Sequence, residues 1–99
     1  MTNVDLAYAS ATELLTLFKA RKASPVEMLK ALIARSQKLN KAINCLADCY
    51  FDEALAKAKA AEQLYAKRGF KPRALEGIPL LVKDAQRVKD KRTTHGSLI

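Results

Sequence analysis

The sequence predicts an α/β protein, because three helical segments precede a continuous apolar run of the kind found in buried β-strands. Each helical segment carries an apolar face at helical spacing and a start or stop signal. The apolar run, residues 78–82, does not alternate with polar residues, which is the pattern of a strand covered on both faces. Such a strand needs partner strands and covering helices, so we expect this chain to supply helices and one core strand.

The first predicted helix covers residues 10–21. Ser10 and Glu13 have the spacing of a capping box, in which the serine oxygen accepts an early backbone N–H and the glutamate reaches back. An apolar stripe follows at helical spacing, formed by Ala11, Leu14, Leu15 and Phe18.

The second predicted helix, residues 24–40, has the most sharply defined start in the chain. Ser24 is the expected cap, Pro25 occupies the first helical position, and Glu27 completes a capping box. The buried face of this helix is expected to consist of Val26, Leu29, Leu32 and Ile33.

The third predicted helix, residues 51–68, is rich in alanine and should stop at Gly69. Residues 43–47, between the second and third helices, are expected to form a short extended piece. The predicted core strand, residues 78–83, begins near Pro79, which lacks a ladder N–H, and ends at Lys83. No second strand follows by residue 99, so we expect either a fragment or a sheet completed by another polypeptide.

The charge and hydropathy patterns exclude several classes of partner. The formal charge of +8 is spread over helical segments, and its densest group, residues 89–92, contains an acid and no aromatic residues. No apolar stretch approaches the roughly 20 residues of a membrane span, and the N-terminus lacks a secretory signal pattern. We therefore expect solvated charge, no nucleic-acid partner, no membrane partner and a cytoplasmic location.

The chain has two cysteines, Cys45 and Cys49, spaced so that both could share one helical face. A structural zinc site needs four ligands, and the sole histidine, His95, lies far away in the sequence. We therefore expect two reduced, partly buried thiols and no metal.

Lys83 is the residue whose position most needs explanation. Its ammonium could reach the surface or pair with Asp84. Alternatively, burial away from water favours the neutral amine, which can act as a base, as in hydrolases that activate serine with lysine.

Residues 77–84, Gly-Ile-Pro-Leu-Leu-Val-Lys-Asp, followed by Thr-Thr-His-Gly-Ser at 93–97, resemble the lysine-bearing motif of the amidase signature family. The typical form is G-[IV]-P-x-x-[VI]-K-D, about eight residues, then T-T-x-G-S, and the spacing agrees. The upstream helical segments are similar too, so the resemblance covers nearly the whole chain. Two positions depart from the pattern: Ala85 stands where the family commonly has asparagine, and Asp90 where it usually has glycine.

The resemblance implies an intact enzyme with a mixed β-sheet sandwiched by helices, of which residues 1–99 form the N-terminal part. It implies hydrolysis of a carboxylic amide to acid and ammonia or amine through an acyl-serine intermediate, without a cofactor. Lys83 would be the catalytic base, acting through a bridging serine on a nucleophilic serine, both outside this sequence. Other residues of the motif would be structural around the site, namely Gly77, Asp84, Thr93, Thr94, Gly96 and Ser97.

The partners and the alternatives follow from the same resemblance. The expected partners are a small-molecule amide, the remainder of the amidase domain, and a second copy in a homodimer. Two alternatives stay open: the amidase subunit of a tRNA-dependent amidotransferase, and a small basic helical module that binds protein or nucleic acid. A triad of His95, Ser97 and Asp84 is not expected, because nothing in the sequence fixes its geometry.

Overall fold

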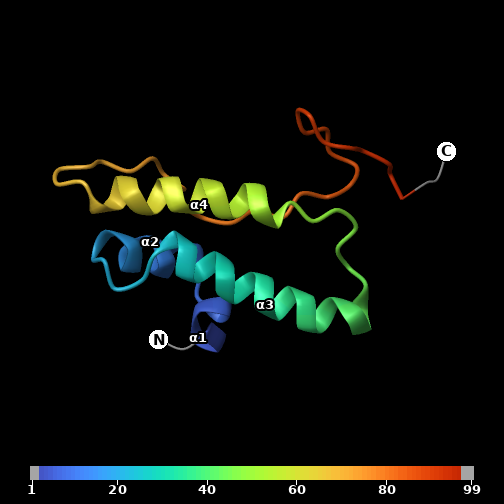
Figure 1. The fold of residues 1–99 in the computed structure, drawn as a ribbon, viewed down its shortest axis with the longest axis horizontal. Helices are drawn as coiled ribbons and strands as arrows, with labels where there is room; N and C mark the ends of the chain where they lie inside the picture. Colours follow the sequence, from blue (N-terminus) through green and yellow to red (C-terminus); the bar gives the residue numbers. More distant parts are fainter. Residues whose placement is uncertain (1–2, 97–99) are drawn as a thin grey trace.

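The computed structural model describes residues 3–96, which contain four α-helices (Figure 1). The helices are α1 (Asn3–Tyr8), α2 (Ala11–Lys19), α3 (Pro25–Ile43) and α4 (Phe51–Ala66). The two long helices α3 and α4 lie side by side, and α1 packs against α3. After α4 the chain returns past this helix toward the α3–α4 loop (Figure 1). No helix within residues 3–96 combines the length and the hydropathy that crossing a bilayer requires.

Helices α2 and α3 begin at the capping serines that the sequence marks. The Ser10 hydroxyl accepts a hydrogen bond from the Glu13 N–H at 3.1 Å, and the Ser24 hydroxyl accepts one from the Glu27 N–H at 3.1 Å. Each bond satisfies a donor that would otherwise be unpaired in the first turn. Both starts therefore follow from local side-chain chemistry.

The short helix α1 is absent from the sequence-based expectation. Its Leu6 side chain is only 3 % exposed and belongs to the core. At its end, Tyr8 accepts a hydrogen bond from Arg35 Nη2 at 2.7 Å, and the same guanidinium lies 4.8 Å from the centre of the tyrosine ring. A helix of six residues is not stable by itself, so packing on α3 determines its position.

The loop between α3 and α4 corrects two expectations. Residues 43–47 are not extended: α3 includes Ile43, and Asn44 ends it with a left-handed backbone at φ 53°. The Leu46 N–H then donates to Asn40 Oδ1 at 2.9 Å. Cys45 and Cys49 lie in this loop and are exposed, not partly buried on a helical face, because the helix has already ended.

The core lies where the helices meet, and Phe18 is its most buried large side chain, at 1 % exposure. The Phe18 ring lies 5.6 Å from that of Tyr65, whose other neighbour, Phe70, is 5.7 Å away. The buried face of α3 differs from the expected one: Met28 and Ala31 are buried beside Val26, whereas three predicted core residues are only half-buried, namely Leu29, Leu32 and Ile33. The apolar face of α3 is therefore wider than the surface that the other described elements cover.

Residues 78–83 form no β-strand in the structure, and residues 3–96 contain none, so the core strand expected in the intact enzyme stays a prediction. Ile78 packs against the core, but Leu80 and Leu81 are 83 % and 82 % exposed. A strand requires a neighbour that completes its ladder of backbone hydrogen bonds, and none of the described segments provides one. The apolar run is therefore irregular and uncovered here.

A turn at residues 73–77 anchors the returning segment to α4. The Tyr65 hydroxyl donates to the main-chain oxygen of Glu76 at 2.8 Å. The buried Glu76 carboxylate accepts hydrogen bonds from Arg73 Nε at 2.8 Å and Arg73 Nη2 at 3.1 Å. This pairing with Arg73 lowers the pKa of Glu76, so the carboxylate remains charged in its buried position.

Candidate functional site

The predicted site residues lie in the irregular segment that follows α4. Gly77 lies beside the core, close to Pro25 and Phe18, whereas Lys83, Asp84 and the Thr-Thr-His-Gly residues come later in the chain. The segment after α4 returns toward the α3–α4 loop (Figure 1). Ser97 lies outside the described residues. The motif is thus divided between a buried anchor and a more exposed loop.

Asp84 is the centre of this loop, which we call the Asp84 loop (residues 84–96). Its carboxylate accepts hydrogen bonds from the Thr94 N–H at 2.9 Å, from the Thr94 hydroxyl, and from the Gly96 N–H at 3.2 Å. The main-chain oxygen of Asp84 accepts a further bond from the His95 N–H at 3.3 Å. The hydrogen bonds from Thr94, with that from Gly96, lower the pKa of Asp84. The structure therefore brings Asp84, Thr94 and Gly96 together.

Asp90 has a backbone reason for the residue type found at its position. Its φ is 62°, in the left-handed region. Glycine adopts this conformation readily, and aspartate is among the few other residues that tolerate it. The departure from the glycine of the resembled motif is therefore compatible with the same turn.

Lys83 lies at the surface, which is one of the two environments that the sequence leaves open, and is not buried away from water. No ion pair joins its amine to a carboxylate within residues 3–96, and the Asp84 carboxylate is occupied by Thr94 and Gly96 instead. The three residues before it, Leu80, Leu81 and Val82, are exposed as well. A cationic side chain thus follows an uncovered apolar surface.

Two cations of the Asp84 loop make contacts that the sequence did not predict. Arg92 Nη2 lies 2.8 Å from Asp48 Oδ1, just before α4. The Lys91 ammonium pairs with Glu53, in the first turn of α4, and lies 4.2 Å from the centre of the Tyr50 ring. The hydrogen bond between Lys91 and Glu53 raises the pKa of Lys91 and lowers the pKa of Glu53. The acidic character of residues 48–53 is the only signal in the sequence that could have indicated these contacts.

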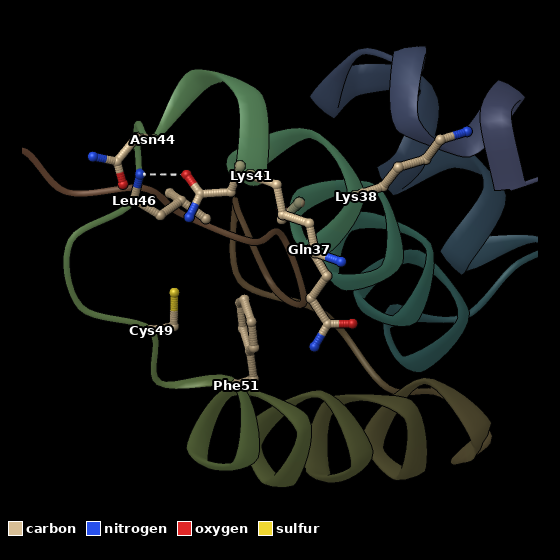
Figure 2. Close-up of a pocket in the computed structure, with 9 residues that line it drawn as sticks. Gln37, Lys38, Lys41, Asn44, Leu46, Cys49 and Phe51 are labelled. Carbon is tan, nitrogen blue, oxygen red and sulfur yellow. Dashed lines mark hydrogen bonds between the residues drawn. The ribbon is translucent and has the colours of Figure 1, made fainter.

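An open hollow between the end of α3 and the start of α4 is a separate feature (Figure 2). None of the predicted site residues among residues 3–96 lines it. Its lining comes from α3, the following loop and the first residue of α4: Ser36, Gln37, Lys38, Asn40, Lys41, Asn44, Leu46, Cys49 and Phe51. The hollow therefore contributes nothing to the geometry around Lys83.

Asp84→Asn is expected to loosen the Asp84 loop. The folded-state pKa of Asp84 is below its ordinary value. The ionised carboxylate therefore stabilises the loop fully at any pH above the ordinary pKa. This contribution is lost as the pH falls through the folded-state pKa. Amide hydrogen-exchange protection of Thr94 and Gly96, compared from about pH 6 to about pH 2, should fall on acidification in the wild type. In Asp84→Asn the protection should be low throughout. Asp52→Asn, at an exposed carboxylate of α4, is the control; undiminished Thr94 protection in Asp84→Asn would contradict the assignment.

Comparison with known proteins gives a consistent result. A family model described as Amidase matches residues 27–99. The chain is 39% identical over 79 residues to a subunit of the glutamyl-tRNA(Gln) amidotransferase of Geobacter sulfurreducens, a match covering 80% of this chain and 16% of the relative. It is 33% identical over 93 residues to an acetamidase of Emericella nidulans, covering 94% of this chain and 17% of the relative.

The corresponding amidotransferase subunit from Solidesulfovibrio magneticus is 38% identical over 96 residues, covering 96% of this chain and 19% of that protein. The chain thus spans less than a fifth of the length of each of these curated relatives. No solved structure matches the chain.

Proposed function

Because this chain belongs to the amidase signature family, as the family match over residues 27–99 shows, we propose that the full-length protein hydrolyses a carboxylic amide to an acid and ammonia or an amine. The observation that carries this proposal is the Lys-Asp…Thr-Thr-His-Gly segment, in which Asp84 binds the backbone of Thr94 and Gly96. These hydrogen bonds hold the backbone immediately after Lys83, so the lysine is attached to an ordered loop.

In this proposal the neutral amine of Lys83 is the base. It accepts a proton from a bridging serine hydroxyl, which in turn takes the proton of a nucleophilic serine. The nucleophilic oxygen attacks the amide carbonyl, the nitrogen leaves with a proton, and water hydrolyses the resulting acyl-serine ester. Both serines would come from sequence other than these 99 residues.

The exposed apolar surface beside Lys83 supports its assignment as the base. Leu80, Leu81 and Val82 expose apolar surface directly before the amine. In the proposed intact enzyme, with its mixed sheet sandwiched by helices, further elements would cover this surface and remove water from the amine. Removal of water favours the neutral form of a lysine, which is the form that accepts a proton.

A second candidate is transfer of the amide nitrogen to a charged tRNA, as part of a larger assembly. The amidotransferase relatives at 39% and 38% identity favour it, since the acetamidase is 33% identical. The two candidates share the base and the acyl-serine step. They differ in whether the nitrogen is released or delivered to a second substrate.

The test is an assay of the full-length protein on a panel of small amides, with ammonia release measured and the acyl-enzyme detected by its added mass. We expect ammonia release and a covalent acyl intermediate. Residues 1–99 alone should release none, because the proposal places both serines elsewhere; turnover by this shorter chain would refute the assignment. Ammonia release that requires charged tRNA and partner subunits would favour the amidotransferase.

A further inference from the structure

Two adjacent cations of the Asp84 loop form ion pairs with residues at or just before the start of α4, and we call these two ion pairs the clasp. The clasp consists of the Arg92–Asp48 ion pair, at 2.8 Å, and the Lys91–Glu53 ion pair, with Lys91 also 4.2 Å from the Tyr50 ring centre. These partners are 44 and 38 residues apart in the sequence. The clasp therefore joins the loop to the start of α4 through long-range contacts.

In each ion pair of the clasp one side chain is partly shielded and the other is exposed. Lys91 is 23% exposed and its partner Glu53 46%, while Asp48 is 28% exposed and its partner Arg92 69%. An isolated exposed pair restrains little, but two adjacent pairs with a cation–π contact restrict the loop at several points. Because Glu53 is in the first turn of α4, half of the clasp is on a rigid element.

The clasp reaches Lys83 through a short series of contacts. Arg92 is two residues before Thr94, whose N–H and hydroxyl bind the Asp84 carboxylate. Lys83 directly precedes Asp84. Upstream, the turn at residues 73–77 holds the same segment to Tyr65 of α4. Between these two anchors, the backbone of residues 79–83 takes part in one hydrogen bond to other backbone groups of residues 3–96, in which the Gln86 N–H donates to the Lys83 oxygen.

We propose that Asp48 and Glu53, acting through Arg92 and Lys91, are positioning residues that fix Lys83 relative to the helices. The proposal rests on the proposed function of Lys83 as the base. A base that is displaced by about 1 Å can cost up to ~10²-fold in rate, so the loop attachment should affect turnover more than substrate binding. Nothing in the clasp is required to touch the substrate.

The experiment uses the full-length protein with a charge swap. Asp48→Arg and Arg92→Asp each break one ion pair and place like charges together, and the double variant restores opposite charges. Asp52→Arg, at an exposed residue of the same region that makes no ion pair within residues 3–96, is the control. The measurements are hydrogen exchange of residues 84–96 by mass spectrometry, kcat per titrated active site, and KM.

Each single variant should speed exchange of the loop by about two- to fivefold, the range of an ion pair of this kind. Each should also lower kcat per active site about tenfold, with KM within about twofold of wild type. The double variant should recover much of both losses. Asp52→Arg should behave as the wild type does.

The outcomes are distinguishable. Faster exchange with unchanged kcat per active site would overturn the positioning role, since the clasp would then be merely structural. Unchanged exchange in both single variants would overturn the clasp itself. If the wild-type protein hydrolyses no amide, the proposed function fails and the positioning role with it, while the exchange data still decide whether the clasp holds the loop.

Discussion

Lys83→Ala in the full-length protein is expected to lower kcat by about 10²–10⁴-fold, the usual contribution of a positioned general base. The base is needed as the serine proton is removed, so the loss should appear mainly in kcat, with KM within a few-fold of wild type. Steady-state ammonia release over a range of amide concentrations measures both constants. Wild-type turnover in this variant would remove Lys83 from the mechanism.

Lys83→Arg separates proton acceptance from positive charge. An arginine keeps the charge but does not give up its proton in a protein, so it cannot act as a base. We therefore expect Lys83→Arg to be as impaired as Lys83→Ala. Lys89→Ala is the matched control, because Lys89 is another exposed lysine of the same segment that makes no ion pair within residues 3–96. Substantial activity in Lys83→Arg would instead assign Lys83 an electrostatic role.

The helices could be predicted because their signals are local. Ser10 and Ser24 each cap a helix through a residue three positions away, so a short window of sequence contains both partners. The end of α3 is harder to predict. Asn44 stops the helix by adopting a left-handed backbone conformation, and the residue type alone does not require that conformation. Helix α1 depends on packing against α3 and carries no comparable signal.

The apolar run at residues 78–83 shows where local reasoning fails. Its composition predicts burial, but burial requires other surfaces, and the exposed Leu80 and Leu81 have none among residues 3–96. The exposure of Lys83 has the same cause. The α/β class predicted for the intact protein therefore remains a prediction, and the described residues establish only its helical part.

The charged loop shows the complementary failure. The composition of residues 89–92 predicts a solvated charge run, because composition does not reveal partners 38 or 44 residues away. In the structure Lys91 and Arg92 form specific ion pairs, whereas Lys89 forms none within residues 3–96. Asp84 differs, because the resemblance implies a structural role for it, and the N–H groups of Thr94 and Gly96 that it binds belong to the same motif.

Gly77→Ala is expected to lower the free energy of unfolding by about 2–4 kcal/mol, because two separate costs add. The backbone of Gly77 is left-handed, at φ 83°, which is unfavourable for any residue with a Cβ. An added Cβ would also lie 2.7 Å from Cγ of Pro25 and 3.5 Å from Cε2 of Phe18. Both neighbours are among the most buried side chains of the core, so neither can move aside easily.

Gly69→Ala is the control that separates the two costs. Gly69 has nearly the same backbone conformation, at φ 78°, but nothing lies within 4 Å of its added Cβ. It should therefore lose only about 1–2 kcal/mol, from the left-handed backbone alone. Urea denaturation followed by circular dichroism measures both variants, with the slope expected to be unchanged. Equal losses at the two positions would show that the approach of Gly77 to Pro25 and Phe18 contributes nothing, and that the turn at residues 73–77 is not packed into the core as described.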